Sequence, residues 1–440
     1  MKNQSMKLIF TSAVCMCTLS SFAQSADSLI TSLWDIHNSV KTQACSNPQI
    51  ISNRAMNIFL SDRIGYYTSS YKDLSLYKNN ITFNSGDGIF AINHNFFQAK
   101  GVDAPVSGFL LVGVKTNVSN AFATTFSNKN YTNELGVTVK KSWISKPVTS
   151  IDNCVEKNIM DVNREQQLLV LNQEIKKKET DFNSSLVAVK KESMPDSVFE
   201  KIKDELTKDF NAGLQQEYQW KFAEQQYREL ALTQRFKTIA LHWTNVSVYL
   251  PVLLQSFVSA ESFAAAVTKK RNYPFELSVN HSRFWETKKY GRFLLTLDAS
   301  TFLNNTAKVK TRETLTYQEY KNNGGADSLL LAQQKINSIF IGNFKNFITT
   351  VIQFKVVYFP HESHIGFSSS IEQNFGDYKA VNFSLGIPVV LIDKTTAPAA
   401  NFEFRINCFD ISHKVYPGRK FGDKVSVSMT VGVPFSKIIF

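Results

Sequence analysis

The strongest constraint in this sequence is the alternation of apolar and polar residues in its last strand-like segment, residues 424–435. Side chains of a β-strand point alternately to its two faces, so the segment is predicted to have one apolar and one polar face. The apolar face carries Val425, Val427, Met429, Val431, Val433 and Phe435. Strands of soluble sheets usually keep such a pattern for about five or six residues. Here it continues for twelve, and a tilted strand that crosses a bilayer needs about 9–11.

Similar patterns recur along the chain and predict about 11 strands, or 12 if one is missed or divided. The segments are 89–97, 108–118, 135–144, 239–250, 275–284, 292–302, 339–359, 365–375, 380–392, 402–411 and 424–435. Segment 339–359 is long enough for one strand or two, and the polar stretch 303–338 predicts a long loop. If 339–359 is one strand and neighbouring strands alternate in direction, the helical segment between 158 and 237 connects to the sheet at the end where the last strand finishes. Two strands there would reverse every earlier connection.

Charged residues stand on the polar faces of these strands. They are Lys115, Asp298, Lys355, Glu372, Glu403, Arg405 and Lys424. In a soluble sheet the apolar faces would need a second layer to cover them, whereas in a membrane barrel they meet lipid and the charges line the interior. Closure also removes exposed strand edges. We therefore predict that the seven charges lie inside a barrel.

These interior charges have two interpretations. They form either a structural network of ion pairs or a ring that selects solutes, and we expect the network. Glu403 and Arg405 share one strand face. We expect them to meet Lys424 or Glu372 on neighbouring strands.

The N-terminus has the pattern of a secretory signal peptide. Lys2 and Lys7 precede an apolar stretch over 8–19, and the small residues Ser21 and Ala23 follow. We predict cleavage after Ala23. Loss of the two lysines would take the net charge from +12 to +10. A basic balance favours anionic partners such as lipopolysaccharide or acidic glycans, but the lysines are scattered along the sequence, so a solvated basic surface is the preferred interpretation.

Three cysteines remain after that cleavage. Cys45 and Cys154 lie in polar, loop-like sequence and could form a disulfide. Cys408 alternates with apolar neighbours and is predicted to pack as a small hydrophobic residue.

A helical pattern interrupts the strands between about 158 and 237. The residues that recur every four positions are Val198, Ile202, Leu206, Phe210, Leu214, Tyr218 and Phe222. They form an apolar stripe on one helix face, and an earlier helix is predicted over 163–191. The two make either a helical hairpin inserted between strands or a helical domain that joins two sheets. We expect the stripe to pack against the neighbouring helix; the alternative is that it docks a partner.

The predicted organisation has five parts. They are a signal peptide (1–23), an N-terminal mixed and helical region (24–80), the first barrel strands (81–145), a helical insertion (146–238) and the remaining barrel strands (239–440). Within the N-terminal region, helices are predicted near 27–40 and 47–59.

The search for chemistry gives no catalytic motif: P-loop, GxSxG, HExxH and dinucleotide patterns are absent from the sequence. His361 and His364 lie in a predicted turn, where two imidazoles do not converge on a metal as a helical pair would. His281 and Ser282 are neighbours on one strand and point to opposite faces. We therefore predict no catalytic residue, no metal centre and no cofactor.

The signal peptide, the alternating strands and a final strand that runs toward Phe440 resemble bacterial outer-membrane β-barrel proteins. The resemblance implies a mainly β fold, an antiparallel up-and-down transmembrane barrel of about 12 strands with a helical insertion and a short N-terminal helical region. In this class the final strand often ends in an aromatic residue that the assembly machinery recognises, which implies that role for Phe435 or Phe440.

The resemblance also implies a place in the outer membrane of a Gram-negative cell. Lipid, lipopolysaccharide and the barrel assembly machinery would then be its partners, and nucleic acid would not. Three functions remain open. The protein is a porin-like pore or membrane-assembly component without catalysis, a barrel scaffold that docks a partner through the helical insertion, or a secreted or periplasmic β-sandwich that binds a ligand.

Overall fold

The computed structural model describes residues 25–43, 45, 48–67, 79–84, 89–97, 103–119, 122–123, 126–127, 130–131, 135–190, 195–252, 255–262, 266–309, 313–322, 328–393, 398–415, 417–418 and 420–434. The chain divides into two compact units. The arm comprises Met1–Ala55 and Asn153–Thr233, and the barrel comprises Met56–Asp152 and Gln234–Phe440. The predicted signal peptide and the aromatic residues Phe435 and Phe440 lie outside the described residues, so those predictions stay predictions.

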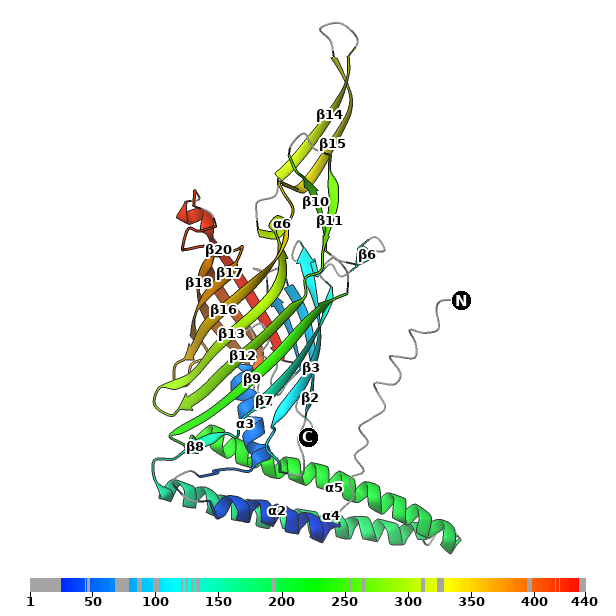
Figure 1. Cartoon of the computed structure of the whole chain (residues 1–440). Helices are drawn as coiled ribbons and strands as arrows, with labels where there is room; N and C mark the ends of the chain where they lie inside the picture. Colours follow the sequence, from blue (N-terminus) through cyan, green and yellow to red (C-terminus); the bar gives the residue numbers. More distant parts are fainter. Residues whose placement is uncertain are drawn as a thin grey trace. The chain divides into compact units, whose positions relative to one another are not determined.

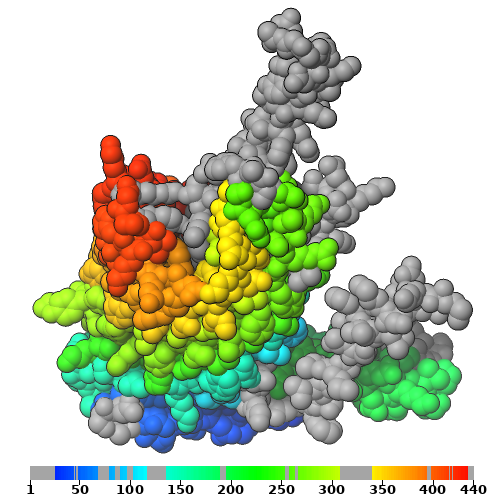
Figure 2. All heavy atoms as spheres, turned by 45° about the horizontal axis from the view of Figure 1, so that its top comes forward, coloured from blue at the N-terminus to red at the C-terminus, as the bar shows by residue number. Residues whose placement is uncertain are grey.

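Twelve antiparallel strands close into a barrel (Figure 1). In order around the wall they are β1 (Asn80–Asn84), β2 (Ile89–Phe97), β3 (Gly108–Ser119), β7 (Gly136–Ile144), β9 (Thr238–Pro251), β12 (Glu276–Thr287), β13 (Gly291–Asn305), β16 (Asn346–Phe359), β17 (Phe367–Gly376), β18 (Val381–Ile392), β19 (Pro398–Cys408) and β20 (Val425–Pro434). The barrel closes where β1 pairs with β20, with Asn80 opposite Pro434. The predicted fold class is confirmed. Figure 2 shows the sequence colours passing in order from green to red along the visible wall, as expected for an up-and-down barrel.

The remaining strands and short helices lie outside this closed ring. They are β4 (Phe122–Ala123), β5 (Phe126–Ser127), β6 (Asn130–Tyr131), β8 (Val148–Ser150), β10 (Gln255–Ala260), β11 (Thr268–Asn272), α6 (Thr306–Val309), β14 (Glu313–Asn322), β15 (Ser328–Ile341) and the 3-10 turn Phe421–Lys424. Strands β11, β10, β15 and β14 form a separate four-stranded sheet.

Two details of the strand prediction were wrong. The stretch 303–338 is more than a polar loop, because it contains β14 and most of β15. Segment 339–359 contains parts of two strands, yet no earlier connection is reversed. The reason is that β15 pairs with β14 and β10 outside the wall. Only β16 crosses the wall in this segment, so the earlier connections lie at the same ends as if the segment were one strand.

The antiparallel order gives the barrel two distinct ends. At the lower end in Figure 1, β12, β16 and β20 finish, and the chain leaves and re-enters the barrel at Asp152 and Gln234. At the upper end lie the four-stranded sheet and the segment between β19 and β20. The helical insertion therefore connects to the end at which the last strand finishes.

The outer face of the barrel is largely apolar. Exposed apolar residues occur around the wall, including Ile92, Val112, Val139, Val279, Leu297, Ile352, Ile371, Leu385, Ile406 and Val427. Near the lower end three aromatic rings stack across neighbouring strands: Trp285 on Phe293 at 5.4 Å and Phe293 on Tyr358 at 4.5 Å between centroids. A closed barrel with an apolar exterior and an aromatic belt has the architecture of outer-membrane β-barrels.

The arm is built from three helices, α2 (Ala26–Lys41), α4 (Cys154–Lys190) and α5 (Asp196–Thr233). Their shared core is Ala26, Leu29, Leu33, Leu168, Leu171, Ile175, Leu214, Tyr218 and Phe222. A disulfide joins Cys45 to Cys154, while Cys408 is free and partly buried. Helix α3 (Asn53–Gly65) begins in the arm and continues in the barrel unit. Within the part of the chain that the structure describes, none of the helices is both long and apolar enough to span a bilayer.

The apolar stripe of the insertion is divided between two environments. Its second half, Leu214, Tyr218 and Phe222, packs against α2 and α4 as expected. Val198 and Leu206 in its first half are exposed.

Candidate functional site in the barrel interior

A short helical segment occupies the lower part of the barrel interior. Residues 56–67, the second part of α3 and the two residues after it, are all buried except the partly buried Arg63. Tyr67 contacts Phe284 of β12 and Phe359 of β16, with ring centroids 6.1 and 5.4 Å away. The Asn401 amide of β19 donates to the Gly65 carbonyl. Since four strands separate β12 from β19 along the wall, only a segment inside the lumen reaches both.

The wall around this segment is lined by large apolar side chains. The buried residues there include Phe109, Phe236, Ile239, Leu241, Trp243, Phe284, Leu294, Val357 and Phe359. Phe59 of α3 meets Phe236 edge to face at 5.9 Å between ring centroids. An eight-stranded barrel is filled by its own side chains, and width grows with strand number. A helix of about 10–12 Å diameter therefore fills space that twelve strands would leave.

Polar contacts fix the helix to the wall. Arg63 Nε lies 3.2 Å from Glu286 Oε2, so a partly buried cation meets a buried carboxylate. The Arg292 guanidinium lies 3.9 Å from the centre of the Tyr66 ring and donates to the Ser363 carbonyl at 2.8 Å. Such pairing offsets the cost of burying charge inside a protein.

His364 also belongs to this contact. Its Nδ1 lies 3.3 Å from the Tyr66 hydroxyl. It sits in the turn between β16 and β17, and burial, reinforced by Arg292 and Arg63, lowers its pKa. The imidazole is therefore held neutral against the two arginines.

Higher in the barrel the interior becomes polar. Side chains of neighbouring strands pair directly: Asn245 with Asn280 at 2.6 Å, Ser247 with Ser278 at 2.6 Å, and Asn304 with Thr349 at 3.1 Å. These hydrogen bonds link polar groups across the strands, although Asn245 Oδ1 accepts none from the described residues. A polar layer of this kind can also be hydrated, so it needs no inserted helix to cover it.

Glu403 is the most buried of the predicted interior charges, with 0% of its surface exposed. Arg405 Nη2 lies 2.7 Å and Lys355 Nζ 3.8 Å from its Oε2, and Ser368 donates to Oε1. Gly386 leaves room for this cluster, because a Cβ there would lie 2.7 Å from Glu403 Oε1.

Glu372 and Lys424 have other partners. The Glu372 carboxylate accepts from Asn382 at 2.8 Å and from Asn374 at 3.1 Å. The buried Lys424 ammonium lies 3.4 Å from Asp410 Oδ2, near the upper end. The expectation that Glu403 and Arg405 would meet Lys424 or Glu372 was therefore wrong, because the strand register brings Lys355 to Glu403 instead.

The last two predicted interior charges lie on inward-facing positions. The Lys115 ammonium lies 5.1 Å from the centre of the Tyr249 ring. Asp298 is partly buried on β13, opposite Asn280 of β12.

The histidines singled out from the sequence bind separate partners. His361 Nε2 lies 2.8 Å from Gln234 Oε1, whereas His364 faces Tyr66. Ser282 pairs with Thr296 at 3.1 Å and His281 with Thr244 at 3.0 Å, on opposite faces of β12. Among the described residues, no group of three or more His, Cys, Asp and Glu side chains is placed to hold a metal ion.

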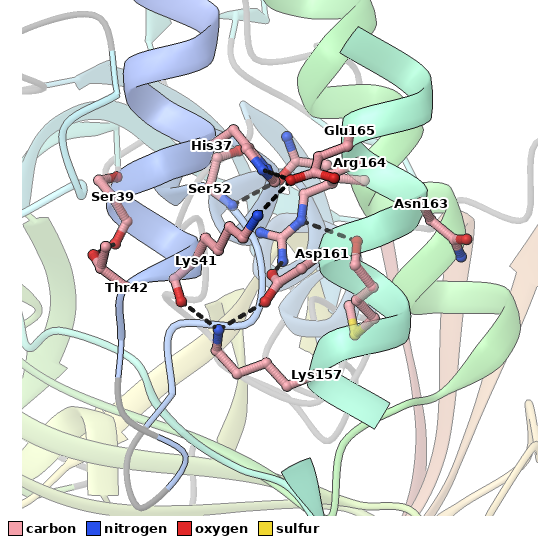
Figure 3. A network of polar contacts seen from close by, with 12 residues as sticks. His37, Ser39, Lys41, Thr42, Ser52, Lys157, Asp161, Asn163, Arg164 and Glu165 are labelled. Carbon is pink, nitrogen blue, oxygen red and sulfur yellow. Dashed lines mark hydrogen bonds and ion pairs between the residues drawn. The ribbon is translucent and has the colours of Figure 1, made fainter. Parts of the chain in front are cut away.

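The arm contains a polar network that the sequence pattern did not reveal (Figure 3). Lys157 Nζ donates to Asp161 at 2.9 Å and to the Lys41 carbonyl at 2.8 Å, and Arg164 pairs with Asp161. The Lys41 ammonium hydrogen bonds to Glu165 and lowers the pKa of that carboxyl. Asp161 pairs with Lys157 and Arg164 at the i,i+4 and i,i+3 spacing of α4. The contacts of Lys41 with Glu165 and Lys157 join α2 to α4, which are far apart in sequence, so no local spacing predicts them.

His37 is buried inside this network. Its Nε2 lies 3.5 Å from Glu165 Oε1. Burial and the nearby Arg164 lower the pKa of His37, with Glu165 acting in the opposite direction. The structure therefore holds His37 neutral between charged neighbours.

No family model matches the chain, and no curated protein matches it. Two solved structures are similar to it. The NanC porin is 8% identical, with 82% of this chain and 98% of that chain covered and a TM-score of 0.27. The beta domain of the Bordetella autotransporter BrkA is 7% identical, with 81% and 96% covered and a TM-score of 0.25. The class of this protein follows from its own geometry: an outer-membrane-type β-barrel with a helix inside its lower end.

Proposed function

We propose that this protein is an outer-membrane β-barrel that α3 seals and that anchors the helical arm for a protein partner. The observation that carries the proposal is the burial of residues 56–67 inside the barrel, in contact with β12, β16 and β19. An enzymatic role has no support from the catalytic motifs or side-chain groupings described above.

The chemistry of the lower interior favours a permanent seal over an open pore. Withdrawal of residues 56–67 would expose Phe236, Phe284 and Phe359, which are now buried and whose rings contact Phe59 or Tyr67. Burial of one large apolar side chain stabilises a fold by about 1.5–3 kcal/mol. The segment therefore belongs to the core of the folded barrel.

The arm offers a surface for a helical partner. Val155, Ile159, Val162 and Leu169 of α4 are 41–62% exposed and follow one another at intervals of four, three and seven residues. This spacing is that of a coiled-coil seam. The buried residues of α4, such as Leu168 and Leu171, face the core of the arm instead. A partner that supplies an amphipathic helix would cover the exposed seam.

A gated channel is the second candidate function. The observation in its favour is that polar contacts hold α3 against the wall, namely the ion pair of Arg63 with Glu286 and the cation–π contact of Arg292 with Tyr66. Contacts of this kind could break and re-form as α3 moves. The polar layer above it would suit a hydrated path once α3 moved.

Conductance in planar bilayers separates a seal from a pore. The wild-type chain is expected to give no steady open conductance. Arg63→Ala combined with Tyr67→Ala should give frequent channel openings, because the ion pair with Glu286 and the aromatic contacts of Tyr67 are both lost. Lys289→Ala, in an exposed turn at the same end, is the matched control and should show no channel openings. Steady conductance of the wild-type barrel would contradict the seal.

Membrane embedding needs its own measurement. The folded protein should require detergent for extraction and should change mobility on a denaturing gel after boiling. Extraction in buffer alone would contradict the outer-membrane location and favour a secreted β-protein.

A further inference from the structure

The outer face of the barrel carries a cationic patch on three adjacent strands, β7, β9 and β12. Its members are Lys141, His242, His281 and Arg283. They occupy outward-facing positions that alternate with buried residues such as Trp243 and Phe284. His242, His281 and Arg283 are exposed, and Lys141 is partly exposed. On the described strands β16, β18, β19 and β20 the outward positions hold no basic residue.

The strand register brings His242, His281 and Arg283 together, whereas Lys141 lies farther along, opposite Val246. Arg283 lies directly opposite His242, and His281 lies opposite Thr244. The rings of His242 and His281 are 5.9 Å apart, and Thr244 Oγ1 lies 3.0 Å from His281 Nδ1. Residues directly opposite on paired strands have Cβ atoms about 4.5–5.5 Å apart. Both imidazoles and the guanidinium can therefore reach one small anionic group.

His242, His281 and Arg283 have no acidic neighbour on the outward positions of the surrounding strands that the structure describes. The outward positions of β7, β9, β12 and β13 hold no Asp or Glu over the register in which these four strands pair. Among the described residues, none of the carboxylates forms an ion pair with Arg283. An arginine on the lipid face costs about 2–4 kcal/mol at the bilayer midplane and about 0–1 near the interface. The patch needs either a shallow position or an anion from outside the chain.

The aromatic residues around the patch indicate its depth. Trp285 lies two positions nearer the lower end of β12 than Arg283 and belongs to the stacked aromatic belt. Trp143 of β7 is 52% exposed and lies opposite Thr244. Aromatic belts mark the headgroup level of a bilayer, and arginine side chains extend toward that level. The patch therefore lies where the phosphates of the leaflet at the lower end would be.

We propose that Arg283, His242 and His281 bind the phosphate of a phospholipid headgroup in that leaflet. The inference rests on the membrane location proposed above. The guanidinium would donate two parallel hydrogen bonds to the phosphate, the geometry for which arginine is suited. Trp143, which lies opposite Thr244 and deeper than Arg283, would contact the glycerol and upper acyl groups. Trp285, nearer the lower end, would lie beside the headgroup.

Native mass spectrometry of the full chain, stripped of lipid in mild detergent, tests this site. Phosphatidylglycerol is the probe, and diacylglycerol, which lacks the phosphate, is the negative control. Arg283→Leu combined with His281→Leu should weaken phosphatidylglycerol binding ~10-fold or more. Lys289→Leu removes a charge from an exposed turn at the same end and should bind as the wild type does. Inorganic phosphate should not compete, since a lipid site also needs the acyl contacts.

The possible failures are distinguishable. Equal phosphatidylglycerol binding by wild type and double variant, or equal binding of diacylglycerol, would overturn the site while leaving the barrel intact. A change in the number of copies per particle without a change in lipid binding would make the patch a contact between barrels and would also overturn it. The gel mobility shift after boiling checks that the variant is folded. Loss of the proposed membrane location would appear in the extraction experiment instead.

Discussion

The two ends of the barrel interior are filled by different kinds of side chain. At the lower end, aromatic and aliphatic residues such as Phe284 and Phe359 surround the buried helix α3. Above this layer Glu403 meets Arg405 and Lys355 near the middle of the barrel, and toward the upper end Asn, Ser and Thr side chains pair across neighbouring strands.

The difference shows where a wide barrel needs an inserted element. Polar side chains on adjacent strands hydrogen bond to one another and can be hydrated, so the upper layer needs no helix to cover it. Apolar side chains in a wide lumen would face water, which carries a free-energy cost that grows with the exposed area. The lower layer therefore depends on α3, and the upper layer does not.

Removal of an aromatic ring from α3 should have the largest effect. Phe59→Ala is expected to destabilise the barrel by about 3–5 kcal/mol, because it leaves a cavity in the packed lower interior. Urea unfolding in detergent, followed by gel mobility without boiling, measures the loss. Phe354→Ala, which removes the same ring from the exposed outer face, is the control and should cost less. Equal losses would show that the lower interior is not a packed core.

A substitution in the upper layer should cost less. Glu403→Gln leaves the Lys355 and Arg405 cations without their carboxylate and is expected to cost about 1–3 kcal/mol. The same unfolding measurement applies. Glu372→Gln is the matched control, since the hydrogen bonds described for that carboxylate come from neutral amides. A larger loss for Glu372→Gln than for Glu403→Gln would contradict the assigned ion cluster.

The smallest predicted effect concerns the arm and its pH dependence. The pKa of His37 is lowered from 6.5 in the folded arm. The unfolded chain therefore binds a proton first as the pH falls below about 6.5, so arm stability should decrease in that range. Thermal unfolding followed at the helical circular dichroism band should give a lower Tm at pH 5.5 than at pH 7.5. In His37→Gln this particular difference should shrink; an unchanged difference would contradict the assignment.

Much of the wall was predictable from the sequence because each long strand alternates over its whole length. Strand β1 was missed because it has only five residues, Asn80–Asn84, too few for the alternation to stand out. The β14–β15 hairpin was missed because its sequence is polar and lies in a stretch rich in Asn and Gly. A strand pattern alone also cannot show whether a strand belongs to the wall.

The site was less predictable than the wall. The helix predicted near 47–59 exists as α3, but its place inside the lumen was not foreseen. One signal was present in the sequence. The apolar residues of this helix are distributed around its whole circumference and do not form a single face, as in a helix buried on all sides; they include Met56, Ile58, Phe59, Leu60 and Ile64. Alternation shows which face of a strand carries Glu403, but it does not specify how the strands are aligned. The observed register places Lys355 near Glu403.

A designed disulfide between α3 and the wall tests the central claim most directly. A Cβ on Gly65 would lie 3.7 Å from the Cβ of Pro398, within the range for a disulfide. Gly65→Cys with Pro398→Cys, in a Cys408→Ser background, should form a cross-link in the folded barrel that changes gel mobility unless a reductant is added. The two single variants provide the controls. Near-complete cross-linking is the predicted result; a folded double variant that forms no cross-link would contradict the account.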